Sequence, residues 1–170
     1  MDTTLVNRVA QSGLITINLE HFFPKGDLAH FDLKNYLFME LILKEKDFRE
    51  ALKSLDWTQY DGKNLLVYCS TDAIIPVWAY MLVASCASPY AREIFQGDEE
   101  SFYKAHYFNY IAQLDVSAYE GQRIVIKGCS DLPVPPAAYL ELTKKLTPTA
   151  QSIMYGEPCS TVPIYKKPKA

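Results

Sequence analysis

The chain has 170 residues, of which 49% are apolar and 22% are charged, and its net charge is −3. These values are typical of a single globular domain and exclude an intrinsically disordered chain. Because basic residues cluster only in the terminal "YKKPKA", we expect no nucleic-acid partner.

Two segments bear on targeting. The first twenty residues carry Asp2, Arg8 and Gln11 among their apolar positions, so we expect no signal peptide. The longest apolar run, residues 73–87, contains a proline and is too short to cross a bilayer. We therefore expect a cytoplasmic protein with no membrane association, whose four cysteines are reduced thiols or metal ligands.

The predicted elements alternate along the chain. Residues 13–24 and 28–38 alternate in polarity like antiparallel or edge strands. A helix over 44–55, a buried strand over 64–69, a helix opened by Pro76 and a short strand over 93–97 follow. The same order then returns as a helix over 99–114, a strand over 123–129, a helix opened by Pro135 and a strand over 152–156.

This recurrence predicts a tandem duplication. An offset of 59 residues lays Gly62 over Gly121 and Pro76 over Pro135. We expect a single domain made of an N-terminal extension (1–43), repeat one (44–98), repeat two (99–157) and a C-terminal tail (158–170). The predicted fold is α/β and three-layered. Its mostly parallel sheet is built from the duplicated α-β-α-β unit, and the N-terminal strands lie outside the duplication.

Three Cys-Ser pairs point to a site. Cys69 and Cys129 each end a predicted strand, and Cys159 follows the last one. The carboxyl ends of parallel strands share one edge of a sheet, so we expect the three cysteines to meet there and bind zinc or an iron–sulfur cluster. The candidates for a fourth ligand, or for groups that support the ligands, are Asp72, Asp131, Ser70, Ser130, Ser160 and Glu157.

Two alternatives remain open. Thiols next to helix N-termini have a lowered pKa, so Cys69 or Cys129 could be a nucleophile or a persulfide carrier in a cysteine-dependent enzyme. Alternatively, the cysteines only fill space, the aspartates cap helices, and the protein is a structural or partner-binding one. Cys86 lies in the middle of a predicted helix and is expected to have no chemical role. The pattern identifies no catalytic residue, and a homodimer is compatible with it.

Five segments together resemble an uncharacterised bacterial family known only as a domain of unknown function. They are "NRVAQSGLITINLE", "LKEKDFRE", "STDAIIPVWAYML", "IKGCSDLPVP" and "SIMYGEPCSTVP". The resemblance covers nearly the whole chain and implies a single-domain cytoplasmic protein without an established activity. It also implies genes near those for iron–sulfur cluster assembly, and hence iron–sulfur assembly proteins as partners.

Overall fold

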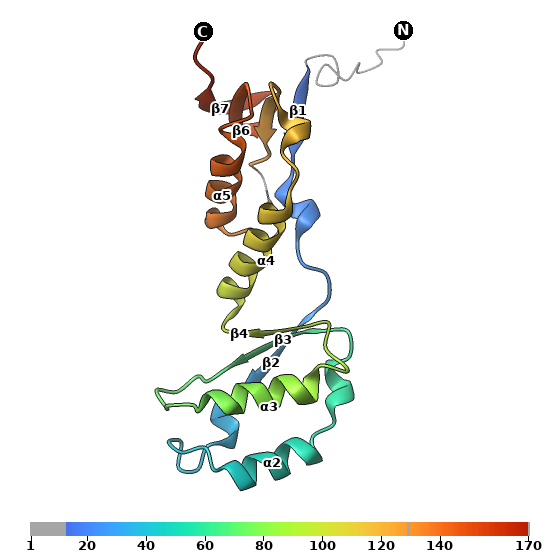
Figure 1. Cartoon of the computed structure of the whole chain (residues 1–170), viewed down its shortest axis with the longest axis vertical. Coiled ribbons are helices and arrows are strands. Elements are labelled where there is room, and N and C mark those ends of the chain that lie inside the picture. Colours follow the sequence, from blue (N-terminus) through green and yellow to red (C-terminus); the bar gives the residue numbers. More distant parts are fainter. Residues whose placement is uncertain (1–12, 129, 170) are drawn as a thin grey trace. The chain divides into compact units, whose positions relative to one another are not determined.

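A computed structural model describes residues 13–128 and 130–169 of the chain (Figure 1). The chain divides into two compact units. Unit 1 comprises residues 1–24 and 103–170, and unit 2 comprises residues 25–102. Unit 2 is thus inserted, in sequence, between two segments of unit 1.

Unit 2 contains a parallel sheet with the strand order β2-β3-β4. Its elements are β2 (Leu28–Asp32), η2 (Leu33–Tyr36), α2 (Glu45–Ser54), η3 (Trp57–Tyr60), β3 (Asn64–Tyr68), α3 (Val77–Ala87) and β4 (Glu93–Gln96). The central strand β3 is buried on both faces, as its continuous apolar run predicts.

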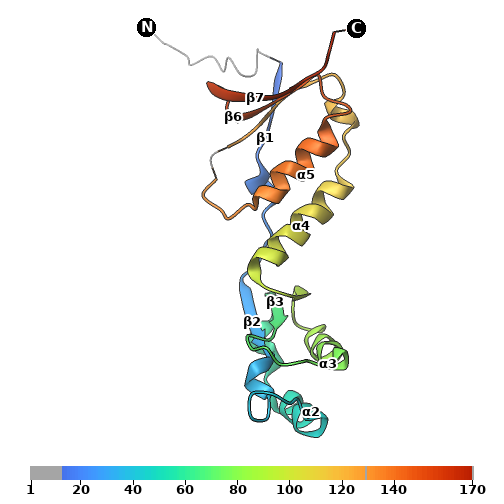
Figure 2. The ribbon, with the colours of Figure 1, turned by 90° about the vertical axis from the view of Figure 1, so that its left-hand side faces the viewer.

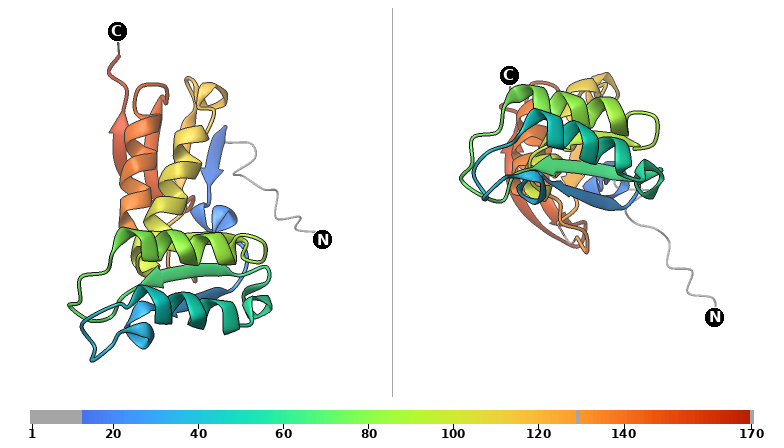
Figure 3. Two further views of the ribbon diagram at one scale, coloured as in Figure 1. Left: turned by 60° about the horizontal axis from the view of Figure 1, so that its bottom comes forward. Right: turned by 90° about the horizontal axis from the view of Figure 1, so that it is seen from below.

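The helices α2 and α3 pack side by side against one face of this sheet (Figure 3). Phe48 of α2 and Val83 of α3 form a core with Leu65 and Val67 of β3. On the opposite face, the ring centroids of Phe95 and Phe102 are 5.6 Å apart, and Phe102 belongs to the first turns of α4 (Glu99–Gln113). Helical residues therefore lie on both faces of the unit 2 sheet, which is consistent with the predicted three-layer architecture.

Unit 1 contains a second sheet with the order β1-β5-β6-β7. Beside most of α4, its elements are β1 (Leu14–Ile17), η1 (Leu19–Phe22), η4 (Ser117–Tyr119), β5 (Arg123–Ile126), α5 (Pro136–Leu146), β6 (Ser152–Glu157) and β7 (Ser160–Lys166). The first three strands are parallel, and β7 runs antiparallel to β6.

The helices α4 and α5 lie on the same side of the unit 1 sheet (Figure 2). Tyr107 and Ile111 of α4 and Leu142 of α5 pack against Ile124 and Ile126 of β5. Proline begins α5 because its fixed φ suits a first helical turn and its missing N–H would have no partner there. None of the described helices is long and apolar enough to cross a membrane.

The predicted α/β class with mostly parallel strands is confirmed. Within residues 13–128 and 130–169, four helices, α2 to α5, accompany the strands, and the strand pairs are parallel except β6–β7. The expectation that one sheet holds all the strands is wrong, because they form two sheets. The N-terminal strands β1 and β2 are edge strands, as predicted, but they pair in parallel. Residues 160–166, predicted to belong to a tail, form β7.

The two units repeat one order of elements, β-η-α-η-β-α-β, from β1 to β6 around the insertion and from β2 to β4 within it. A duplication would produce this order of elements. The repeated unit would then include β1 and β2, which the sequence placed outside it. The duplication itself stays a prediction.

Candidate functional site

In unit 2, the Cys-Ser segment follows the central strand and is bound by a carboxylate from the neighbouring strand. Asp32 is the last residue of β2. Its Oδ1 accepts the N–H of Ser70 at 3.0 Å, and its Oδ2 accepts the Ser70 hydroxyl at 2.5 Å. Oδ1 also accepts the N–H of Lys34 at 2.9 Å and so caps η2. One carboxylate therefore fixes the backbone directly after Cys69.

The pKa of Asp32 reports this arrangement. Burial acts to raise it, but the hydrogen bonds from Ser70 and Lys34, with the positive charge of Lys34, outweigh burial and lower the pKa. Asp32 is therefore ionised at neutral pH. Its bonds to Ser70 are charge-assisted, which makes them stronger than bonds between neutral groups.

Unit 1 has a similar contact, made by a different residue. Glu20 lies in η1, and its Oε1 accepts the hydroxyl of Ser130 at 2.9 Å and the N–H of Leu132 at 3.0 Å. The N–H of Asp131 donates to the same oxygen. The hydrogen bonds from Leu132, Ser130 and Asp131 lower the pKa of Glu20.

Asn18 shows why the sequence did not reveal this contact. Its Oδ1 accepts the N–H of Glu20 at 3.0 Å and caps η1, just as Asp32 caps η2. Asn18 therefore occupies the place of Asp32, and the carboxylate of unit 1 comes two residues later. The sequence carries one sign of the shared cap: a short polar side chain followed by leucine in both segments, "INLE" and "FDLK".

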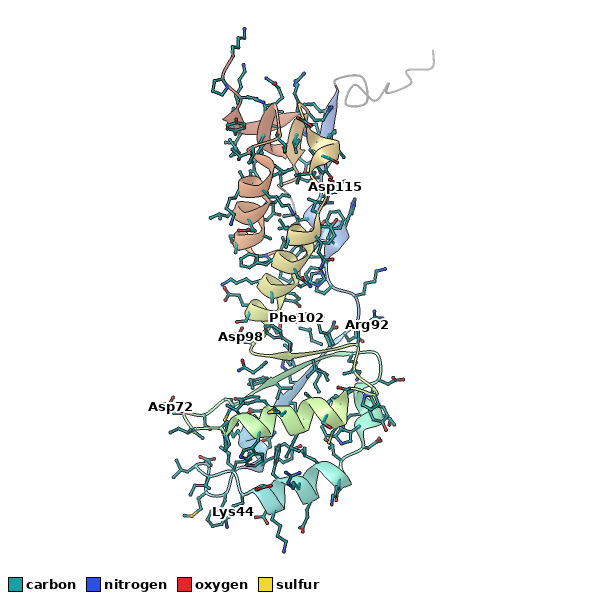
Figure 4. The ribbon with its side chains drawn as sticks, in the orientation of Figure 1. Lys44, Asp72, Arg92, Asp98, Phe102 and Asp115 are labelled. Carbon is teal, nitrogen blue, oxygen red and sulfur yellow. The ribbon has the colours of Figure 1, made fainter. Side chains whose placement is uncertain are left out.

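The thiol of Cys69 is half-buried at the end of β3. Its Sγ lies 3.3 Å from Oγ1 of Thr71, and its side chain packs against the unit 2 core. Burial raises the pKa of Tyr80, and the neighbouring Cys69 adds to this rise, so the phenol and the thiol are near one another. Asp72 is exposed on the loop that joins β3 to α3 (Figure 4).

Cys159 is exposed in the turn between β6 and β7. Gly156 shapes this turn, because its φ is +126° and a Cβ there would come within 2.6 Å of the carbonyl oxygen of Ser160. Residues next to the turn approach Gly128, which follows the neighbouring strand β5. A Cβ on Gly128 would lie 3.1 Å from the Gly156 Cα, and the Tyr155 hydroxyl donates to the Gly128 carbonyl at 3.2 Å.

Cys129 comes directly after Gly128 but lies outside the described residues. The structure therefore brings the segment that precedes Cys129 against the turn that carries Cys159. Ser160, the residue after Cys159, is exposed and pairs with Glu157 across the start of the hairpin.

One carboxylate oxygen of Glu157, at the start of this turn, has an unusual environment. Its Oε1 is buried and has no hydrogen-bond partner within the part of the chain that the structure describes. A buried polar atom without a partner costs about 1–3 kcal/mol, so such atoms call for an explanation. A metal ion bound by this oxygen, or a group that donates a hydrogen bond to it, would supply one.

A pocket of about 240 Å³ lies between α5 and the unit 1 sheet. Tyr139 and Tyr155 line it, and their rings meet edge to face with centroids 5.8 Å apart. Burial raises the pKa of Tyr139, and Tyr155 and Glu20 raise it further. Glu20 and the two tyrosines therefore surround the same strand ends.

The three cysteines do not share one sheet. The expectation of a single common edge is wrong because Cys69 follows a strand of the unit 2 sheet, whereas Cys159 belongs to the unit 1 sheet. In residues 13–128 and 130–169, no group of three or more His, Cys, Asp or Glu side chains is arranged to hold a metal ion. The metal site stays a prediction.

Cys86 is half-buried in α3 and packs against the unit 2 core. The groups that the sequence missed are Asp32, Glu20, Gly128 and Tyr155. Each acts through a contact between segments that are distant in sequence.

No curated protein and no solved structure matches this chain. One family model matches residues 3–167, nearly the whole length. Its description is "Protein of unknown function (DUF2480)", and it agrees with the resemblance seen in the five segments. The chain belongs to this family of unknown function.

Proposed function

We propose that the protein is a cytoplasmic accessory in metal or sulfur handling and that its site is at the carboxyl edge of the unit 1 sheet. Cys129, Cys159 and Glu157 are the proposed metal ligands. The observation that supports this proposal is the buried Oε1 of Glu157, which lacks a hydrogen-bond partner in the described chain, two residues from Cys159.

The donor set suits a thiophilic metal. Two cysteine thiolates and one carboxylate oxygen are three of the ligands that zinc takes in proteins, and the fourth position would be left to water or to a partner's group. Iron–sulfur species are also held by thiolates. Bound metal would pair the Glu157 oxygen and so remove the cost of burying it alone.

Cys69 has a separate place in this proposal. It follows a strand of the other sheet, so a contribution of Cys69 to the same metal has to be tested on its own. Asp72 and Asp131 are exposed, and the backbone rather than the side chain of Asp131 contacts Glu20. The structure gives these two aspartates less support as ligands than it gives Glu157.

The exposure of Cys159 favours a second candidate, a persulfide carrier. The Cys159 thiolate would attack the terminal sulfur of a persulfide on an iron–sulfur assembly protein. A new S–S bond would form to that sulfur as the donor's S–S bond breaks, and the donor would leave as a thiolate. Such a transfer needs an accessible thiol, and Cys159 is exposed whereas Cys69 is half-buried.

Elemental analysis and absorption spectra of protein purified without oxygen test the first proposal. We expect about one metal ion per chain for a site of this kind. Cys159→Ser, Cys129→Ser and Glu157→Gln should each lose most of that metal, whereas the matched control Cys86→Ser should keep it. Cys69→Ser shows whether the third cysteine takes part.

Two results would overturn the metal proposal. One is wild-type protein that neither carries metal nor binds added zinc. The other is equal metal loss in Cys86→Ser and Cys159→Ser. The persulfide proposal is tested by mass spectrometry after incubation with a persulfide donor. It predicts an added sulfur, 32 Da, on the peptide that contains Cys159, and an unmodified Cys159 peptide would refute it.

A further inference from the structure

One end of unit 2 exposes a group of large apolar side chains, which we call the apolar end. Its six residues are 48% to 91% exposed and come from two loops and the start of α3: Phe38, Met39, Leu41, Ile42, Ile74 and Val77. The loops, residues 37–44 and 69–76, lie side by side in the ribbon views (Figures 1 and 3).

The apolar end is large for a surface that a monomeric protein exposes to water. At roughly 100 Å² each, six side chains make about 600 Å², the upper end of the range for the largest apolar patch on a typical monomer, and such patches often mark interaction sites. With a polar rim, the apolar end reaches the ~800 Å² that each partner contributes to a standard interface.

The helix α3 extends the same surface. Its outward residues Val77 and Met81, one turn apart, are 75% and 66% exposed. A surface helix normally turns a polar face outward, as α2 does with its lysines and glutamates. The outward face of α3 begins with these two apolar residues and α3 carries no charged side chain, which is typical of a helix that is covered in the assembled protein.

The loop at the apolar end is held in shape. The N–H of Phe38 donates to the Ile42 carbonyl at 2.7 Å, and the N–H of Ile42 donates back at 3.1 Å. Between them, Met39 and Glu40 have φ angles of +51° and +59°, the left-handed region that side chains other than glycine seldom adopt. A loop fixed in this way loses little entropy when it binds a partner.

The charges of the loop are self-complementary. Glu40 makes no hydrogen bond or ion pair in the described chain, and the Nζ of Lys44 lies 3.4 Å from the centroid of the Phe38 ring. This acid and this base flank Leu41 and Ile42. One charge of each sign favours neither an acidic nor a basic partner, but it suits a two-fold contact in which Glu40 of each copy meets Lys44 of the other.

From these observations we propose that the apolar end is the two-fold interface of a homodimer. The apolar residues and the outward face of α3 are buried at its centre, and the two Glu40–Lys44 pairs lie at its rim. The interface contains none of the proposed metal ligands, so it stands independently of the metal and sulfur proposals.

Sedimentation equilibrium on the full chain tests the apolar contact. Wild type should be a dimer at micromolar concentration. The double variant Leu41→Lys, Ile74→Lys should raise the dissociation constant by at least ~100-fold, because it places charges in the buried centre. Leu140→Lys is the matched control. Leu140 is 68% exposed on α5 of unit 1, so this variant should remain a dimer.

A charge exchange tests the two-fold geometry. Glu40→Lys and Lys44→Glu should each raise the dissociation constant at least ~10-fold, because like charges then face each other at two symmetry-related places. The double variant with both changes should return to within ~3-fold of wild type. Circular dichroism should be the same for all variants, since the substituted side chains are exposed.

Three results would overturn this proposal. One is a wild-type chain that is monomeric at ~100 µM, well above the affinity expected for an interface of this size. Another is a double charge variant that is no tighter a dimer than either single variant. The last is a monomeric wild type that binds phosphatidylcholine vesicles through the apolar end, which would assign this surface to a bilayer.

Discussion

Tyr107 offers the sharpest test of the packing of unit 1. Its side chain is fully buried, and its hydroxyl donates to the Leu19 carbonyl at 2.8 Å. This bond joins α4 to η1, directly before Glu20, which binds the Ser130 loop. Tyr107→Phe deletes the oxygen, keeps the ring and leaves the Leu19 carbonyl without this donor.

The expected cost depends on what the deletion leaves behind. A typical neutral hydrogen bond contributes a net of about 0.5–1.5 kcal/mol to the free energy of unfolding, but removing one partner so that a buried carbonyl has no donor costs about 1–3 kcal/mol, and this second case applies here. Because the ring remains, there is no loss of apolar burial to add. We expect Tyr107→Phe to lower the free energy of unfolding by about 1–3 kcal/mol at pH 7.

Urea unfolding followed by circular dichroism measures this loss. The matched control is Tyr110→Phe on the same helix. Tyr110 stacks on Phe22 at 4.2 Å between centroids, and its hydroxyl makes no hydrogen bond in the described residues. The control should change stability by no more than ~0.5 kcal/mol. Equal effects of the two substitutions would refute the role assigned to the Tyr107 hydroxyl.

Alkaline pH gives an independent readout of the same group. Burial, with smaller contributions from Tyr139 and Glu20, raises the pKa of Tyr107 above its usual value of 10.0. A raised pKa means that the stability contributed by the neutral phenol is complete below pH 10 and is lost as the pH rises above it. Tyr107→Phe should therefore flatten the loss of stability above pH 10, and an unchanged slope would contradict the buried phenol.

Three further predictions follow from single contacts. Lys145→Met removes the ammonium that donates to two carbonyls at the end of α4, so we expect a loss of about 1–2 kcal/mol in thermal unfolding, with Lys144→Met, an exposed neighbour, nearly neutral. Gly156→Ala should cost more than Gly62→Ala in urea unfolding, because both glycines have positive φ but only Gly156 lacks room for a Cβ; equal costs would contradict the turn geometry. The hydrogen bonds of Glu20 lower its pKa from 4.5. The stability that Glu20 contributes is therefore present above pH 4.5 and is lost as the pH falls below this value. Glu20→Gln should reduce this loss of stability in an acid-unfolding titration.

Local patterns predicted most of the elements well. Of the apolar, β-branched run over 123–129, Arg123–Ile126 form β5, and of the helix predicted over 44–55, Glu45–Ser54 form α2. Pro135 was placed correctly at the opening of a helix, where it is the N-cap of α5. Each of these features depends on periodicity or on the conformational limits of proline, which a short stretch of sequence already determines.

The pairing of strands could not be predicted in the same way. A continuous apolar run shows that a strand is buried on both faces, but it does not show which strand is its neighbour. β2 and β1 both pair with strands that follow much later in the sequence, and either set of partners would satisfy the same pattern. The prediction of one sheet therefore failed, and the common edge for three cysteines failed with it.

The two carboxylate contacts explain what the Cys-Ser pattern describes. In both units it is the serine that the neighbouring edge element binds, through Asp32 in one unit and Glu20 in the other. A bound serine fixes the main chain next to the cysteine whether or not the thiol has any chemical role. Recurrence of Cys-Ser is therefore evidence for a structural contact first. The case for chemistry depends on what the two sites do not share: the exposed Cys159 and the buried oxygen of Glu157, both in unit 1.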